Sequence, residues 1–222
     1  SKFLKFLISA KNKYQFDKNT YQNRHQVEKY NDFVNDSLGI NFSPKRLILS
    51  TINSKPLIKK TVGINPGASY GSAKRWYPQE FAKVASELSS KYDIVIFGGS
   101  SEVDIANDIE KLLIENNITN YQNLAGKTSI TQLIENISNL DLFITGDSGP
   151  MHVAAAFQVS TVAIFGPTKD DETSQWMNGK SVIVKKSLEC QPCMKRTCPL
   201  KHHNCMKLIT STEVLNAVNN LV

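Results

Sequence analysis

The 222-residue sequence predicts an α/β protein built around a Rossmann-like, doubly wound parallel sheet. From residue 61 onwards, short continuous apolar runs alternate with stretches whose apolar residues recur at helical spacing. Strands buried on both faces of a parallel sheet have such continuous apolar sequences. Glycine and small polar residues follow four of these runs, as expected where parallel strands end at a ligand crevice.

Composition and charge restrict the class of protein. With 41% hydrophobic and 21% charged residues the chain is typical of a globular protein, and no apolar run reaches the ~20 residues of a membrane-spanning helix. Residues 1–60 hold 12 Lys and Arg against 4 Asp and Glu, whereas the remainder holds 14 against 16. A basic flank suits an anionic partner or is a solvated tail. Charge alone identifies no ligand, and we expect no nucleic-acid partner.

Residues 1–60 form the first predicted domain, which contains too little apolar material to predict an independent core. A helix that stops at Gly39 is predicted by apolar residues at helical spacing, namely Val27, Tyr30, Val34 and Leu38. A β-like run, Arg46–Ser50, follows Pro44. Because the sequence starts at Ser1 rather than at a methionine, we expect that an upstream portion is missing.

Residues 61–222 form the second predicted domain, which contains the sheet. The predicted strands are Thr61–Asn65, Asp93–Phe97, Leu142–Thr145, Thr161–Phe165, Ser181–Val184 and, more weakly, Tyr121–Leu124. Amphipathic patterns predict helices around 81–88, 105–113 and 130–137. A last helix is expected to start at the capping box Thr210-x-x-Glu213.

Four loops at strand ends predict the ligand site. Each glycine taken alone is explained as a turn residue. Four loops that converge on one sheet edge instead predict a site where backbone closely approaches a phosphate-bearing ligand. These loops are Pro66-Gly67-Ala68-Ser69, Gly98-Gly99-Ser100-Ser101-Glu102, Gly146-Asp147-Ser148-Gly149 and Gly166-Pro167-Thr168.

The third loop carries the strongest single signal, because Pro150-Met151-His152 and a helix-forming stretch follow it. Ser148 or Asp147 can cap this helix, and free N–H groups with the positive end of the helix dipole make an anion site. We expect Asp147 to accept backbone N–H bonds and so hold the loop in shape. His152 either donates to a phosphate oxygen or is structural.

Lys74 and Glu102 are the other charged candidates. Lys74 lies on a small-residue loop, where its cation would neutralise the charge of a departing diphosphate; the alternative is a surface lysine. We expect Trp76 to pack beneath this loop. Glu102 follows the second strand and would either accept from a ribose hydroxyl or complement a helix dipole. The sequence has no P-loop, no G-x-G-x-x-G after the first strand and no nucleophile elbow.

These motifs resemble glycosyltransferase family 9, the bacterial heptosyltransferases, with the heptosyltransferase II type as the nearest pattern. The resemblance covers about residues 61–222, with a fainter similarity at 25–40. It rests on Asn65-Pro66-Gly67-Ala68, Lys74-Arg75-Trp76-Tyr77-Pro78, Phe97-Gly98-Gly99 with Glu102, Asn123-Leu124-Ala125-Gly126, Gly146-Asp147-Ser148-Gly149-Pro150-Met151-His152 and Phe165-Gly166-Pro167-Thr168.

The resemblance implies that residues 61–222 are the C-terminal, donor-binding domain of a GT-B glycosyltransferase, and that residues 1–60 are the tail of its N-terminal acceptor domain and the interdomain connector. Such an enzyme transfers heptose from ADP-heptose to the lipopolysaccharide core with inversion, without a metal or cofactor. It is cytoplasmic, with peripheral contact at the inner membrane. Carried over, Lys74 is the catalytic residue that stabilises the ADP leaving group, Glu102 holds the ribose, and the remaining donor-binding residues are Ser69, Tyr70, Asp147, Ser148, Gly149 and His152. Because the family's general base lies in the N-terminal domain, we expect this chain to bind donor but not to transfer heptose efficiently.

The four cysteines form one cluster, Cys190-x2-Cys193-x4-Cys198-x6-Cys205, with His202 and His203 between the last two. The spacing allows a structural zinc site, disulfides or reduced thiols, and nothing indicates secretion.

Two other functions stay open at this level. Another GT-B sugar-nucleotide transferase or an epimerase would bind uridine nucleotides more tightly than ADP. A non-catalytic nucleotide-binding module would have no acceptor domain. The preference for adenine comes from the resemblance alone.

Overall fold

The computed structural model describes residues 7–50, 59–68 and 70–222. The chain divides into two compact units, one of Ser1–Lys45 with Asp171–Thr173 and one of Arg46–Asp170 with Ser174–Val222. The sequence boundary near residue 60 stays a prediction.

The first unit contains helix α2 (Gln26–Leu38), at the place where the apolar spacing predicts a helix. The helix begins at a capping box in which Glu28 accepts the backbone N–H of His25 at 3.0 Å. It ends at Gly39, whose φ of 65° lies in the left-handed region that favours glycine. The aromatic side chains of this unit pack on one another, with Phe16 in contact with the rings of Tyr21, Tyr30 and Phe33.

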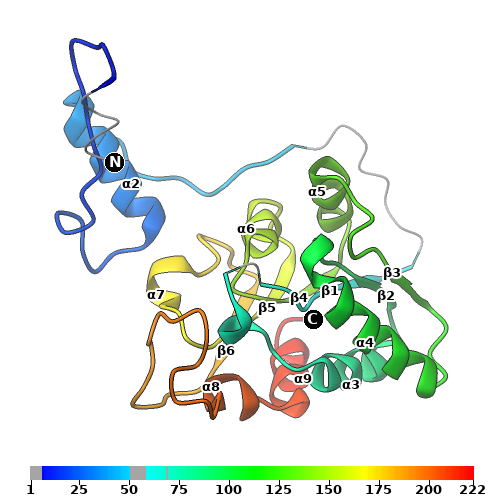
Figure 1. The fold of residues 1–222 in the computed structure, drawn as a ribbon. Coiled ribbons are helices and arrows are strands. Elements are labelled where there is room, and N and C mark those ends of the chain that lie inside the picture. The colour runs from blue at the N-terminus through cyan, green and yellow to red at the C-terminus, as the bar shows by residue number, and fades with distance from the viewer. Residues whose placement is uncertain (1–6, 51–58, 69) are drawn as a thin grey trace. The chain divides into compact units, whose positions relative to one another are not determined.

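The second unit is built on a six-stranded parallel sheet with the order β3-β2-β1-β4-β5-β6, shown in Figure 1. The doubly wound fold is confirmed, and each predicted strand agrees with the observed one to within a residue at either end. The strands are β1 (Thr61–Asn65), β2 (Asp93–Ile96), β3 (Tyr121–Asn123), β4 (Leu142–Gly146), β5 (Ser160–Phe165) and β6 (Ser181–Lys185). Since the chain leaves β3 to form β4 on the other side of β1, the topological switch point lies between β1 and β4.

The predicted run Arg46–Ser50 is wrong as a strand, because the structure shows no strand there. A strand needs a partner to receive its backbone hydrogen bonds. Ile48 and Leu49 are instead 70% and 42% exposed.

Helices cover both faces of the sheet (Figure 1). On one face lie α3 (Pro78–Leu88), α4 (Val103–Glu115) and α9 (Ser211–Asn219), and on the other α5 (Ile130–Ser138) and α6 (Gly149–Ala156). The capping box predicted for the last helix is confirmed, since Thr210 accepts from the Glu213 backbone and Glu213 from that of Thr210. Short helices η1 (Ser72–Lys74), η2 (Ser100–Glu102), α7 (Asp170–Thr173) and α8 (Asn204–Lys207) complete the elements described.

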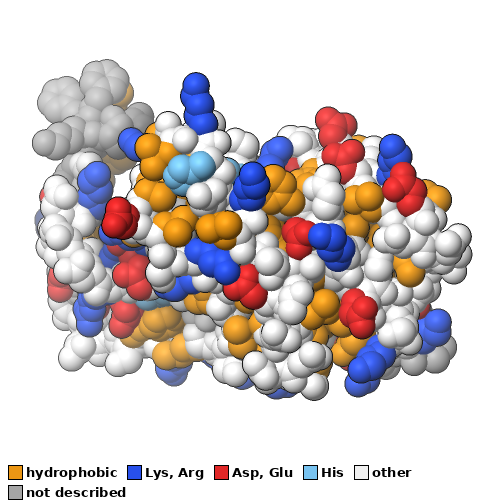
Figure 2. Space-filling view, turned by 90° about the horizontal axis from the view of Figure 1, so that it is seen from below, with side chains coloured by type: hydrophobic (Ala, Val, Ile, Leu, Met, Phe, Trp, Pro, Cys, Tyr) orange, Lys and Arg blue, Asp and Glu red, His pale blue; other side chains and the backbone are white. Residues whose placement is uncertain are grey.

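Figure 2 views the molecule from the side on which α3, α4 and α9 lie. Lys and Arg side chains are interspersed there with Asp and Glu, and apolar side chains are scattered between them. The positive net charge is therefore not gathered into one band on this face. Among the described residues, no helix is long and apolar enough to cross a membrane.

The core on the α5 side packs directly over a glycine of the central strand. A Cβ at Gly63 would lie 2.5 Å from Leu140 Cδ1 and 2.8 Å from ring atoms of both Phe143 and Phe97. These three side chains belong to one buried cluster. The absence of a side chain at Gly63 therefore allows them to close over β1.

We call residues 186–206 the cysteine segment; it runs from β6 into α8 and packs along the ends of β1 and β5. Met194 donates to Pro167 O at 2.9 Å, and the Gln191 side chain donates to Gly166 O at 2.7 Å. The four thiols are free, and the described residues contain no group of three or more His, Cys, Asp or Glu arranged to hold a metal ion. Burial raises the pKa of the Cys205 thiol to about 11, and the neighbouring Cys198, Cys193 and Cys190 add to the shift.

Replacement of Gly63 by alanine tests the packing over β1. We expect Gly63→Ala to lower the free energy of unfolding by about 2 kcal/mol, because the methyl group overpacks the cluster. Gly179→Ala is the matched control, since a Cβ there meets no atom within 4 Å. Urea denaturation measures both, and equal stabilities of the two variants would contradict this account of the core.

The raised pKa of Cys205 predicts an order of thiol reactivity. The thiolate is the nucleophile, so a thiol with a pKa of about 11 stays protonated at pH 8.5. We expect iodoacetamide to modify Cys205 last at that pH, as followed by peptide mass spectrometry. In urea, all four cysteines should react at similar rates. Early alkylation of Cys205 in the folded chain would show that the thiol is neither buried nor protonated.

Candidate functional site

A pocket of about 360 Å³ opens at the carboxyl edge of the sheet, beside the switch point. The loops after β1, β2 and β4 form three of its sides. Ile130 and Leu133 of α5 provide an apolar wall, and Glu102 is the charged side chain among the described residues that line it. The pocket therefore combines an apolar surface for a flat ring with one carboxylate that accepts hydrogen bonds.

Glu102 is held in place by two glycines. Its Oε2 accepts the backbone N–H of Gly99 at 2.7 Å. A Cβ at Gly67 would lie 2.2 Å from Glu102 Cδ and 2.5 Å from each carboxylate oxygen. Glu102 is also the N-cap residue of α4. The sequence offers two alternatives for Glu102, a ligand contact or a residue at a helix start. In the structure Glu102 both lines the pocket and precedes α4.

The start of α6 faces the same pocket through Ser148, Gly149 and Pro150. Ser148 is the N-cap residue but makes no side-chain capping bond. Its hydroxyl lies 3.1 Å from Asn65 Nδ2 and 3.1 Å from Thr145 Oγ1. A Cβ at Gly149 would meet no atom within 4 Å. Of the first three residues of α6, Pro150 has no N–H and Met151 N donates to Ser148 O at 3.2 Å. This helix start can therefore offer an anion the Gly149 N–H and the positive end of the helix dipole.

Asp147 and Lys74 form a buried ion pair next to this helix start. Lys74 Nζ lies 2.6 Å from Asp147 Oδ2 and also donates to the backbone oxygen of Asp147 at 3.0 Å. The side chains are only 12% and 8% exposed. The hydroxyl of Thr168 donates to the same Oδ2 at 2.7 Å. We expected backbone N–H groups to bind the Asp147 carboxylate, but its partners are the side chains of Lys74 and Thr168. These contacts tie the loops after β1, β4 and β5 together.

Of the other predicted site residues, Tyr70 contacts this pair. The Tyr70 ring centroid is 4.9 Å from Lys74 Nζ, and its hydroxyl donates to Met194 O at 2.8 Å. His152 lies in the first turn of α6 and is half-buried. Ser69 lies outside the described residues. The structure thus brings Tyr70, Lys74 and Asp147 together, with Glu102 and Ser148 on the adjoining pocket.

The turn that carries Lys74 is held from the cysteine segment by His203. The imidazole Nε2 lies 2.9 Å from Ala73 O and Nδ1 lies 3.1 Å from the Tyr77 hydroxyl. Because a carbonyl oxygen only accepts, Nε2 carries the proton and Nδ1 accepts from Tyr77. Burial raises the pKa of Tyr77, which keeps its hydroxyl protonated as that donor. The sequence places His203 among the cysteines of a possible metal site. In the structure its contacts with Ala73 and Tyr77 position the loop that carries Lys74.

Trp76 packs beneath this loop, as predicted. It is 2% exposed and its indole N–H donates to Ile209 O at 3.0 Å. Thr168 and Asn65 also lie in the motifs at the strand ends, but the sequence does not distinguish them as site residues. Their positions could have identified them, because Asn65 ends β1 and Thr168 follows β5.

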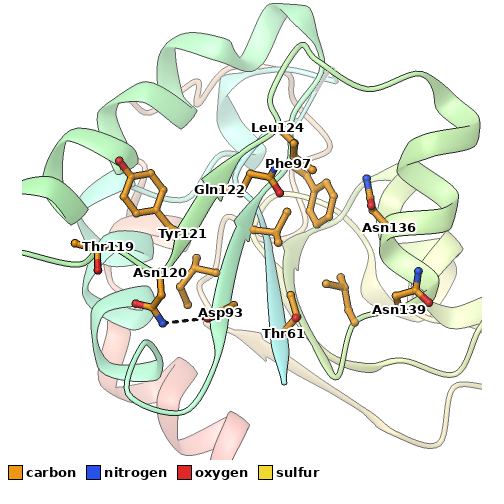
Figure 3. A pocket seen from close by; sticks show the side chains of 13 residues that line it. Thr61, Asp93, Phe97, Thr119, Asn120, Tyr121, Gln122, Leu124, Asn136 and Asn139 are labelled. Atoms are coloured by element: carbon orange, nitrogen blue, oxygen red, sulfur yellow. Dashed lines mark hydrogen bonds between the residues drawn. The ribbon is translucent and has the colours of Figure 1, made fainter. Parts of the chain in front are cut away.

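A second pocket of about 480 Å³ begins at the amino ends of the strands, beside Thr61 and Asp93 (Figure 3). Side-chain amides surround it, and Asn120 Nδ2 lies 3.5 Å from Asp93 Oδ1. Asp93 is the charged residue among the described side chains that line it. This pocket offers a phosphate neither a cation nor a helix start, so the carboxyl edge remains the candidate donor site.

Comparison with known proteins gives one consistent answer. The family model of Glycosyltransferase family 9 (heptosyltransferase) matches residues 8–204. The chain is 48% identical over 229 residues to the lipooligosaccharide heptosyltransferase 2 of Campylobacter jejuni, a match that covers all of this chain and 72% of that protein.

Two solved structures have the same fold. The structure of the Escherichia coli ADP-heptose lps heptosyltransferase II matches with a TM-score of 0.64 and 30% identity, over 73% of this chain and 46% of that one. A glycosyltransferase family 9 structure from Veillonella parvula matches with a TM-score of 0.76 and 23% identity, over 93% and 61%. The matched part thus spans less than half of the E. coli chain. From the family model and the Campylobacter relative, the chain belongs to glycosyltransferase family 9, the heptosyltransferases.

Proposed function

We propose that this chain binds ADP-heptose at the carboxyl edge of its sheet and supplies the donor-binding half for transfer of heptose to the lipopolysaccharide core. The observation that carries the proposal is the buried Lys74–Asp147 pair beside the open start of α6 and the pocket of Glu102. The E. coli heptosyltransferase II is described as an ADP-heptose enzyme, which supports this choice of donor.

The pocket suggests how the donor is oriented. The adenine ring lies against Ile130 and Leu133, and the ribose hydroxyls donate to the Glu102 carboxylate. The diphosphate then reaches the Gly149 N–H and the positive end of the α6 dipole. In this arrangement the residues near the diphosphate and heptose are Ser69, Tyr70, Lys74, Asp147, Ser148, Gly149 and His152.

Lys74 has the part of a catalytic residue in this proposal. When the bond between the heptose anomeric carbon and the phosphate oxygen breaks, negative charge accumulates on the leaving ADP. An ammonium group and a helix start placed beforehand stabilise that charge. Asp147 positions the ammonium, because it accepts from Lys74 while Thr168 fixes the carboxylate. The proposal needs no metal or other cofactor for this step.

The acceptor belongs to the same proposal. A lipopolysaccharide core acceptor is assembled at a membrane, so the reaction is proposed for the cytoplasmic side of the inner membrane with at most peripheral contact. Mass spectrometry of a purified core acceptor incubated with ADP-heptose tests this part. As the donor-binding half, this chain should transfer little heptose, and a rate equal to that of a full-length enzyme would contradict the proposal.

Nucleotide titration by calorimetry tests the donor site. We expect the chain to bind ADP more tightly than UDP, and Lys74→Ala to weaken ADP binding about tenfold through loss of a charge-assisted contact. The same variant should lose about 3 kcal/mol of stability, because it leaves the buried Asp147 carboxylate without its cation. Binding is therefore measured well below the melting temperature of the variant.

Lys111→Ala is the control for loss of one lysine, since Lys111 is 77% exposed and lies on α4 away from the pocket. It should bind ADP as the unmodified chain does. Tighter binding of UDP would assign the chain to another sugar-nucleotide enzyme. An unchanged affinity for ADP in Lys74→Ala would remove Lys74 from the site.

The position of Glu102 can be tested through a glycine. In Gly67→Ala the methyl group would lie within 2.2 Å of Glu102 Cδ, so the carboxylate must move away from the ribose position. We expect ADP and adenosine to lose affinity by about the same factor, roughly fivefold for one hydrogen-bonded contact. Glu102→Gln should have a similar effect, whereas Gly179→Ala should have none. Normal adenosine binding by Gly67→Ala would place the ribose elsewhere.

A further inference from the structure

The charges at the donor site do not suffice for a diphosphate as they stand. Lys74 is compensated by Asp147 at 2.6 Å, and the adjoining pocket contains the Glu102 carboxylate. The start of α6 contributes only about half a positive charge. A doubly or triply charged diphosphate would therefore meet little net positive charge from the residues singled out in the sequence. A further cation close to Lys74 would add the net positive charge that these residues do not supply.

Arg196 lies close to the Lys74 loop, although 122 positions separate the two residues in the sequence. Its backbone oxygen accepts from Ala73 N at 3.0 Å. A Cβ at Gly71 would lie 2.3 Å from this same oxygen, so the backbone approaches closely because residue 71 is glycine. The backbone at Arg196 is thus fixed against the η1 turn on which Lys74 lies.

The Tyr70 ring links the two cations. Lys74 Nζ lies 4.9 Å and Arg196 Cζ 5.2 Å from its centroid, both within the range of a cation–π contact. Because both distances are measured to the same centroid, at most about 10 Å separates the two charges. The ring is held by the bond from its hydroxyl to Met194 O. Tyr70 thus keeps Arg196 near Lys74 without neutralising either charge.

The guanidinium of Arg196 is available for a ligand. Its side chain is exposed, and within the described part of the chain its charged group contacts the Tyr70 ring and no carboxylate. A guanidinium donates two parallel hydrogen bonds to phosphate oxygens, which an ammonium does not. Unlike Lys74, Arg196 therefore has a charge that no carboxylate of the described residues balances and a planar group that can bind two phosphate oxygens at once.

We propose that Arg196 is a donor-binding residue that contacts the diphosphate as the second cation of the site, and that the cysteine segment serves to place it there. The inference rests on the proposed donor site. It also assigns a role to the segment: the segment's contacts with Pro167, Ala73 and Tyr70 hold the arginine beside the loop of Lys74.

Calorimetric titration with ADP and with adenosine tests this inference on the full chain. The variants are Arg196→Ala, Arg196→Lys and, as the matched control, Lys195→Ala at the neighbouring exposed cation. Because Arg196 joins Ala73 through its backbone, the alanine variant keeps that bond, and thermal melting checks that the fold is intact.

We expect Arg196→Ala to weaken ADP binding about tenfold and adenosine binding less than twofold, since adenosine has no phosphate. Arg196→Lys should be intermediate, and Lys195→Ala should bind ADP normally. Normal ADP binding by Arg196→Ala, with binding by the unmodified chain intact, overturns the role of Arg196 alone. Equal losses for ADP and adenosine also overturn it, because the defect would not concern the diphosphate. If the unmodified chain does not bind ADP, the proposed function and this inference both fail.

Discussion

The Lys74–Asp147 ion pair is the contact around which the proposed donor site is organised. It joins the loop after β1 to the loop after β4, on either side of the switch point of the sheet. Thr168 adds the loop after β5 through the same carboxylate oxygen. A buried carboxylate is costly unless it is paired and hydrogen-bonded. The pair therefore couples three loops, because displacing any one of them leaves a charge or a hydroxyl without its partner.

The same pair limits what Lys74 does for a ligand. Because Asp147 already balances its charge, Lys74 can orient a ligand and donate hydrogen bonds to it, but it adds little net positive charge. The site then depends on groups that the sequence does not place near Lys74, such as the start of α6 and, in our inference, Arg196. The positive charge that Arg196 would add depends on where the cysteine segment lies. Contacts of Ala73 with Arg196 and with His203 hold that segment beside the loop after β1.

Glycines determine where backbone and side chains come close. Gly67 leaves room for the Glu102 carboxylate, Gly71 for the backbone of Arg196, and Gly63 for three apolar side chains. In each case an added methyl group would collide with a defined neighbour. Gly67 belongs to one of the loops from which the ligand site was predicted, Gly71 belongs to the small-residue loop that carries Lys74, and Gly63 lies within the strand that precedes both. Close packing and ligand access therefore depend on the same short stretch of chain.

The sequence by itself determined the strands, the main helices and the loops at the carboxyl edge, because these depend on local periodicity, on capping residues such as Thr210 and on glycine at strand ends. It also placed Glu102 and the start of α6 at the site by their positions after β2 and β4. Only the tertiary structure decided which side chains meet there. The partners of Asp147 lie 73 and 21 positions away in the sequence, and strand order with loop packing, rather than spacing, brings them together. The same dependence explains the run Arg46–Ser50, whose apolar residues lack the neighbouring strand that a β-ladder requires.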